Sequence, residues 1–322
     1  MRLLSLSAVA IMLGAWGDAS AQGYPVRPVR VVVGFAPAGA PDIVARLISE
    51  PLGARLGQTI VVDNRPGANG VIGADIVSRS PPDGYTVLVT SQSFAANPSI
   101  YRKLPYDPLR DFSPVTNIAV GGGSILCVGP QVPAKSVAEL TALARKPGAR
   151  ISYGSAGTGN TTHLAAALLN SRLGTDMVHV PYKSAGQAIA ALMGGEVQVL
   201  FTSPSSSLQH IKAGRVRALA YNYPKRLDLL PDLPTMEEAG VKGTTIDPSW
   251  YGVFAAPKTP AAIVARLQEE IRAVTMNPVV RERLAAQNLE PDGRPPAEFQ
   301  RFVAGAVGRM RELIKLAGIE PQ

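Results

Sequence analysis

Two glycine-rich segments contain the residues best suited to bind a small anion. The first spans residues 34–42 (GFAPAGAPD) and the second residues 154–163 (GSAGTGNTTH). Each follows an apolar, strand-like stretch and leads into a helical pattern. Small residues let a ligand approach the backbone closely, and the free N–H groups at a helix start attract negative charge. A tight turn explains either segment alone equally well, but the presence of two favours a shared anion site.

Two further strand ends carry hydroxyl groups suited to the same ligand. Residues 90–93 (TSQS) end a strand in the first half of the chain, and residues 202–205 (TSPS) end one in the second. Ligands of parallel α/β sheets bind at the carboxyl ends of the strands. Ser and Thr also cap helices routinely, and the sequence leaves both roles open. The candidate ligand-binding residues are Phe35, Ala36, Ala38, Gly39, Ala40, Asp42, Ser91, Ser93, Ser155, Ala156, Gly157, Thr158, Thr162, His163, Thr202 and Ser203.

Catalytic and metal-binding motifs are not apparent. The sequence has neither a Gly-x-Ser-x-Gly elbow nor a phosphate-loop lysine. His163, His179 and His210 lack metal-ligand spacing, and His163 alone lies beside a glycine-rich segment. The single cysteine, Cys127, lies in an apolar run, which predicts a core residue and excludes an internal disulfide. We therefore expect a protein that is not an enzyme and that has no metal or other cofactor.

The charge pattern argues against a nucleic-acid partner. The net charge is +8, but the Lys and Arg residues are scattered singly, without basic runs or interleaved aromatic residues. We interpret the basic balance as solvated surface with a mild preference for anionic ligands.

The N-terminus predicts a signal peptide over residues 1–21. Arg2 precedes a short apolar run over residues 3–16, and residues 19–21 (ASA) form a small-x-small cleavage site. The run is shorter than the roughly 20 residues that a membrane span needs. The mature chain is expected to begin near Gln22 and to be periplasmic, with an uncleaved anchor as the alternative.

Alternating strand and helix patterns position these segments. Residues 29–33 are expected to form a strand and 42–56 a helix, and the pattern recurs at 151–153 and 161–173. Such alternation predicts parallel sheets with crossover helices, and about 300 mature residues favour two lobes. Two apolar segments, 121–128 and 248–256, are expected to cross between them. The predicted fold class is α/β, with residues 22–124 and 248–322 in the first lobe and 125–247 in the second.

A set of motifs, in order along the whole mature chain, resembles the Bug-type extracytoplasmic solute-binding proteins. These proteins are the receptor component of tripartite tricarboxylate transport systems. Besides the first glycine-rich segment, the motifs are residues 24–30 (YPVRPVR), 63–70 (DNRPGANG), 82–86 (PDGYT), 104–108 (LPYDP) with 111–112 (DF), 153–157 (YGSAG), 179–183 (HVPYK), 233–235 (LPT), 238–240 (EAG) and 250–252 (WYG).

The resemblance implies a type II periplasmic-binding-protein fold, in which two α/β lobes are joined by two crossing strands and enclose the ligand. It also implies capture of a small carboxylate, such as a di- or tricarboxylate, by a monomer that passes it to a membrane permease. In similar proteins, backbone amides and waters of the loops matching residues 35–42 and 155–162 hold one carboxylate. The alternatives are a periplasmic sensor that feeds a two-component kinase and, third, a secreted hydrolase or isomerase.

Three positions depart from the family pattern. Ala38 stands where a glycine is usual, Pro41 where a hydroxyl residue is common, and Thr202 where an aspartate often follows the strand. Pro41 also lacks an N–H, so one potential donor is lost. These changes bear on which acid is bound, and the absence of the aspartate makes an amino-acid ligand less expected.

Overall fold

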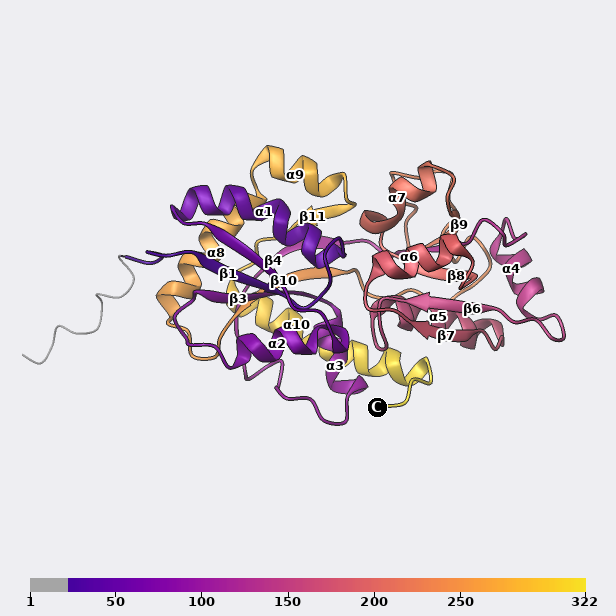
Figure 1. Ribbon diagram of the computed structural model, residues 1–322, viewed down its shortest axis with the longest axis horizontal. Helices are drawn as coiled ribbons and strands as arrows, with labels where there is room; N and C mark the ends of the chain where they lie inside the picture. Colours follow the sequence, from indigo (N-terminus) through magenta and orange to yellow (C-terminus); the bar gives the residue numbers. More distant parts are fainter. Residues whose placement is uncertain (1–22) are drawn as a thin grey trace, which may run out of the picture.

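The computed structural model describes residues 23–322, so the predicted signal peptide and its cleavage site lie outside the described residues. Two α/β lobes lie side by side, and each is built around one β-sheet with helices packed on it (Figure 1). The predicted two-lobed α/β architecture is therefore present. No helix of the described chain is long and apolar enough to cross a membrane.

The first lobe contains a six-stranded sheet in the order β11-β4-β10-β3-β1-β2. Its strands are β1 (Val29–Val33), β2 (Ile60–Asn64), β3 (Thr86–Ser91), β4 (Ser113–Gly121), β10 (Trp250–Ala255) and β11 (Leu289–Pro291). Its helices are α1 (Ala40–Leu56), the 3-10 turn η1 (Ala68–Gly70), α2 (Val71–Ser78), α3 (Ser93–Ile100), α8 (Ala261–Thr275), α9 (Pro278–Ala285) and α10 (Pro296–Leu316).

The second lobe contains a five-stranded sheet in the order β7-β6-β8-β5-β9. Its strands are β5 (Ser124–Val128), β6 (Ser152–Ser155), β7 (Val178–Pro181), β8 (Val199–Thr202) and β9 (Arg217–Asn222). Its helices are α4 (Val137–Ala144), α5 (Thr161–Leu173), α6 (Ala185–Gly194) and α7 (Pro204–Lys212).

Both sheets combine parallel and antiparallel pairs. Strand β1 runs parallel to β2 and β3, and β6 runs parallel to β7 and β8, as the alternating pattern predicts. The strands that run against the others are β10 and β11 in the first sheet and β5 in the second. The carboxyl ends of β1, β3, β6 and β8 consequently lead into loops near the junction of the lobes.

An aromatic cluster joins the helices and sheet of the first lobe. The Phe254 ring on β10 lies 4.7 Å from that of Phe94 on α3 and 5.0 Å from that of Phe299 on α10, measured between centroids. All three side chains are almost fully buried, and burying each contributes on the order of 2 kcal/mol. Helix α10 also contacts α5, so the C-terminal helix reaches both lobes (Figure 1).

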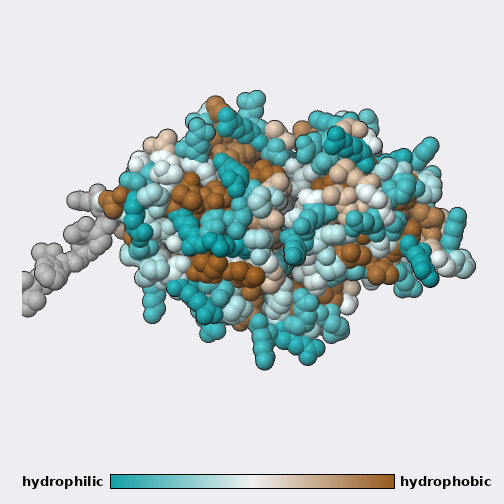
Figure 2. Space-filling model, in the orientation of Figure 1, coloured by the Kyte–Doolittle hydropathy of each residue, from teal (hydrophilic) through white to brown (hydrophobic). Residues whose placement is uncertain are grey.

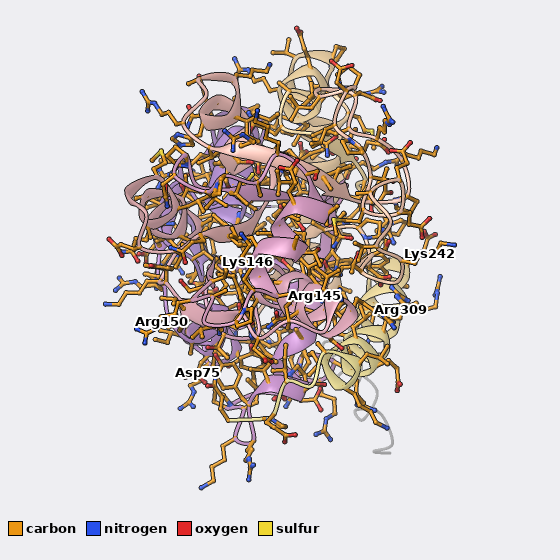
Figure 3. The ribbon with its side chains drawn as sticks, turned by 90° about the vertical axis from the view of Figure 1, so that its right-hand side faces the viewer. Asp75, Arg145, Lys146, Arg150, Lys242 and Arg309 are labelled. Carbon is orange, nitrogen blue, oxygen red and sulfur yellow. The ribbon has the colours of Figure 1, made fainter. Side chains whose placement is uncertain are left out.

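Charged groups are spread over the surface. On the face shown in Figure 2, hydrophilic side chains surround and separate the apolar groups. At the end of the second lobe, Arg145, Lys146 and Arg150 lie around the end of α4, and Lys242 lies in the segment before β10 (Figure 3). Arg145 is held there by hydrogen bonds to the Leu173 carbonyl.

The first crossing between the lobes is made by two glycines. Strand β4 ends at Gly121 and β5 begins at Ser124, so Gly122 and Gly123 connect the sheets. A Cβ added at Gly123 would lie 1.9 Å from the carbonyl oxygen of Asn222, which is backbone and cannot turn aside. The close pairing of β5 with β9 at the crossing therefore requires glycine.

We expect Gly123→Ala to lower the free energy of unfolding by about 2 kcal/mol, because β5 and β9 must move apart to admit the methyl group. Urea unfolding measures the change. Gly194→Ala is the control, because no atom lies within 4 Å of the Cβ added at that helix position and its stability should be equal or slightly higher. Equal stability of the two variants would contradict the prediction.

Candidate functional site

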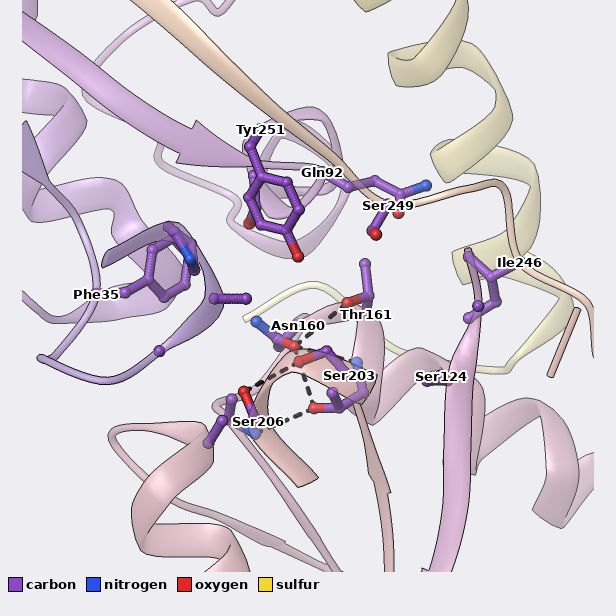
Figure 4. Close-up of a pocket in the computed structure, with 18 of the residues that line it drawn as sticks. Phe35, Gln92, Ser124, Asn160, Thr161, Ser203, Ser206, Ile246, Ser249 and Tyr251 are labelled. Atoms are coloured by element: carbon purple, nitrogen blue, oxygen red, sulfur yellow. Dashed lines mark hydrogen bonds between the residues drawn. The ribbon is translucent and has the colours of Figure 1, made fainter. Parts of the chain in front are cut away.

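A cavity of about 100 Å³ lies between the two lobes (Figure 4). A space of this size holds a molecule of about ten non-hydrogen atoms. Its wall combines the loops after β1, β3, β6 and β8 with both crossing segments. In Figure 4, Phe35 lies to one side of Thr161, and Ser124 and Ile246 lie to the other.

Five helices begin at this wall. Ala40 starts α1, Gln92 precedes α3, Thr161 starts α5, Ala185 starts α6 and Ser203 precedes α7, and all five residues line the cavity. The N-terminus of a helix carries about half a positive charge and N–H groups without intrahelical acceptors. The cavity is therefore surrounded by partial positive charge.

The described part of the cavity wall contains no side chain with a full positive charge. Among the described residues that line the cavity there is no Lys or Arg, and the one charged side chain is Asp247. The Asp247 carboxylate is engaged by Arg309 of α10. The wall can thus accept one anion through backbone and hydroxyl donors, in place of an ion pair.

Asp42 shapes the first loop from outside the cavity. Its carboxylate accepts hydrogen bonds from the Ala38 N–H, from Asn64 Nδ2 and from Arg46 Nε, each at 2.9 Å. Burial opposes ionisation of the carboxyl, but the hydrogen bonds from Arg46, Asn64 and Ala38 outweigh it, so the pKa is lowered. Asp42 therefore stays ionised and fixes the turn that presents Ala40.

The second loop is held by four of its own side chains. Asn160 caps α5 by accepting the Thr162 N–H at 3.1 Å, and Thr162 Oγ1 accepts the Ala156 N–H at 3.1 Å. His163 Nδ1 accepts the Gly159 N–H at 3.1 Å, and the Ser155 hydroxyl accepts a Gly157 N–H at 3.2 Å. These bonds fix the direction of the remaining N–H groups at the start of α5.

Two histidines that are 16 positions apart in the sequence stack on each other. The rings of His163 and His179 lie 3.8 Å apart, and Tyr153 stacks on His179 at 5.1 Å, because β6 pairs with β7. Burial, reinforced by His179, lowers the pKa of His163 to about 3, and burial lowers the pKa of His179 to about 4. Within residues 23–322 no group of three potential metal ligands occurs.

In the structure Ser155 and His179 form a hydrogen-bonded pair that their spacing in the sequence does not indicate. Ser155 Oγ lies 2.7 Å from His179 Nε2. Ser155 is fully buried, does not line the cavity and is bonded within its own loop to Gly157. The pair therefore supports the loop and does not present a nucleophile to the cavity.

Half of the sixteen predicted site residues line the cavity, and the other half do not. Those in the wall are Phe35, Ala36, Gly39, Ala40, Ser91, Ala156, Thr162 and Ser203. Those outside it are Ala38, Asp42, Ser93, Ser155, Gly157, Thr158, His163 and Thr202. Asp42, Ser155 and His163 hold the loops, as described above. Direct contact of any of the sixteen with a ligand stays a prediction.

Sequence reasoning did not select several wall residues as ligand-binding. Asn160 and Thr161 lie inside the second glycine-rich segment, and the N-cap position of Asn160 was a usable signal. Tyr251 belongs to the second crossing segment. Ser124 belongs to the first crossing segment, whereas Asn222 reaches the cavity through the pairing of β9 with β5, which leaves no local signal.

The family model for the tripartite tricarboxylate transporter family receptor, TctC, matches residues 44–319. The chain belongs to this receptor family. TctC-family proteins are solute-binding receptors and not enzymes, in agreement with the absence of catalytic motifs from the sequence.

Three solved structures of similar proteins have the same fold. The periplasmic binding protein BugD is 35% identical, with a TM-score of 0.88 over 93% of this chain and 100% of its own. An R. palustris protein solved with adipate is 36% identical, with a TM-score of 0.88 over 93% and 100%. MatC from Rhodopseudomonas palustris, solved with malate, is 31% identical, with a TM-score of 0.85 over 90% and 100%.

We expect Ala38→Gly to raise the free energy of unfolding by about 1 kcal/mol. Ala38 has a φ of 64°, a left-handed conformation that costs alanine more than glycine. Ala54→Gly, at an exposed position of α1, should change stability in the opposite direction through the lower helix propensity of glycine. Thermal or urea unfolding measures both, and equal signs would contradict the argument.

We expect stability to fall as the pH falls from about 6.5 towards 4. The unfolded histidines bind protons near pH 6.5, whereas His163 and His179 stay neutral in the fold until about pH 3 and 4. Unfolding therefore takes up protons in this window, and the loss should reach at least about 2 kcal/mol at pH 4.5.

The double variant His163→Asn with His179→Gln should have a flatter pH profile, because Asn and Gln keep an acceptor near Nδ1 and Nε2 but do not titrate. Urea unfolding at a series of pH values makes the comparison. A wild-type profile that is level between pH 6.5 and 4.5 would contradict the prediction.

Proposed function

We propose that this TctC-family receptor captures a small organic acid in the cavity between its lobes. Capture takes place in the periplasm, and the receptor then delivers the acid to a permease in the membrane. The observation that carries the proposal is the meeting of the starts of α1 and α5 at a wall without Lys or Arg among the described residues. One carboxylate of the ligand binds between these two helix starts.

Only a few backbone N–H groups near the starts of α1 and α5 are free to bind the ligand carboxylate. The first N–H groups of a helix have no intrahelical acceptor, which applies to Ala40 in α1 and Thr161 in α5. Neighbouring donors are already used or missing: Pro41 has no N–H, and the Ala38 and Thr162 N–H groups bond to Asp42 and Asn160. The Ala40 and Thr161 N–H groups therefore serve as the central carboxylate donors.

The ligands of similar proteins support an acid as the solute. The adipate and malate named for two structural relatives are carboxylic acids of about ten non-hydrogen atoms, a size that the cavity of about 100 Å³ admits. BugD is named as a periplasmic protein, which supports the same location for this chain.

Contacts beside the cavity support closure of the lobes around the ligand. Asn160 of the second lobe donates to Ser93 Oγ at 3.1 Å and to Asn69 Oδ1 at 3.3 Å in the first lobe, and all three residues are buried. A ligand that contacts both lobes stabilises this closed arrangement over an open one. The permease then recognises the closed form.

Proline substitution removes a single donor at either helix start. Thr161→Pro and Ala40→Pro place proline at the first helical position, where it is well tolerated. The preceding residues, Asn160 (ψ 154°) and Gly39 (ψ 155°), already have the extended conformation that proline requires. Each variant should bind a carboxylate at least about tenfold more weakly, since hydrogen bonds to charged groups contribute about 1.5–3 kcal/mol.

The solute is identified by native mass spectrometry of the ligand retained on purified protein, and its affinity is measured by calorimetry. Thr161→Ala is the matched control, because it keeps the N–H and removes the hydroxyl, and it should retain most of the affinity. Retention of a sugar or a metal ion, or equal affinity of Thr161→Pro and Thr161→Ala, would contradict the proposal.

A further inference from the structure

Asn222, the last residue of β9, has a buried carboxamide in the cavity wall to which no described residue forms a hydrogen bond. The residue is 1% exposed and lines the cavity. Neither its Oδ1 nor its Nδ2 has a hydrogen-bond partner among the described residues. Buried side-chain amides are nearly always hydrogen-bonded. The Asn222 amide offers one donor group and one acceptor to the cavity, so we expect the ligand to carry a group that can both accept and donate.

Strand register orients Asn222 toward the cavity. Asn222 lies directly opposite Ser124 in the antiparallel pair of β9 and β5, and opposite residues project on the same face of a sheet. Ser124 lines the same cavity. The adjacent pair, Tyr221 and Ile125, belongs to the other face and is packed in the apolar core of the second lobe.

The Asn222 end of the cavity is separate from the first loop. Ser124, its partner in register, lies with Ile246 on the side of Thr161 opposite to Phe35 (Figure 4). A ligand whose carboxylate binds at the helix starts can therefore extend its other end toward Ser124 and Asn222.

The charges of the wall determine which group suits this end. Asp247 follows Ile246 and is the one charged side chain of the described wall, where no Lys or Arg is present. Arg309 already pairs with the Asp247 carboxylate, so a second carboxylate of the ligand would be buried here without a cation of its own in the described wall, which is costly. A hydroxyl or carboxamide is uncharged and matches the donor and the acceptor of Asn222.

We propose that Asn222 selects a monocarboxylic acid whose far end carries a neutral hydroxyl or carboxamide group, in preference to a dicarboxylate. This inference rests on the proposed function, because it takes one carboxylate at the helix starts as given. It separates this chain from the relatives solved with adipate and malate, both of which carry two carboxylates.

The test uses acids of four, five and six carbons with four kinds of far end: methyl, hydroxyl, carboxamide and carboxylate. Calorimetry on the whole protein measures each affinity. At the best-fitting length, the hydroxyl and carboxamide acids should bind at least about tenfold more tightly than the methyl and carboxylate ones. Asn222→Leu, which has the same number and branching of side-chain heavy atoms, should remove this preference and leave the affinity for the methyl-ended acid within about threefold.

Stability distinguishes ligand recognition from a structural role. Asn222→Leu should melt at the same temperature as the wild type or higher, because it removes unbonded polar atoms from a buried position. Asn97→Leu is the matched control: Asn97 is also 1% exposed, but its amide bonds to Asn69 and Tyr106, so its melting temperature should fall.

Three outcomes overturn the inference. If carboxylic acids bind equally whatever their far end, or if Asn222→Leu keeps the preference, Asn222 does not select the ligand although the proposed function stands. If none of the acids binds at any of the three lengths, the proposed function fails and the inference fails with it.

Discussion

The proposed binding of an acid depends on one electrostatic constraint: the anion must leave water and enter a wall in which the described residues include no Lys or Arg. Removing a carboxylate from water without compensation costs far more than the stability of a domain. In the proposed function the compensation comes from helix starts, chiefly those of α1 and α5, which lie at the cavity wall. Because such groups act only over the first turn, the two loops must hold these starts in place.

The side chains behind the wall meet that requirement. Asp42 fixes the first loop through Ala38 and Asn64, and Ser155, Asn160 and His163 fix the second. Their hydrogen bonds join protein groups to one another, so they hold the loops through the fold itself, and holding a loop in place reduces the entropy lost on association. The neutral state of His163 also helps to hold the second loop, because a protonated Nδ1 could not accept the Gly159 N–H.

Local sequence signals predicted the two loops of the cavity wall that lead into α1 and α5. Glycine-rich segments after apolar strands identified both loops, and the alternation of strands and helices, together with the family motifs, predicted the two-lobed fold. Ser124 and Asn222 could not be predicted in this way, because they meet through antiparallel pairing of strands that are almost 100 positions apart. The stacking of His163 on His179 likewise depends on the packing of α5 against β6 and on the pairing of β6 with β7, which spacing along the chain does not reveal.

The two ends of the cavity differ in how substitution can change them. The backbone N–H groups at Ala40 and Thr161 persist with any residue except proline, so the feature that we propose to attract acids is encoded in the fold itself. Asn222 and Ser124, in contrast, contribute side chains that a single codon change replaces. A receptor built this way can evolve toward a new acid at its far end while retaining its affinity for acids as a class.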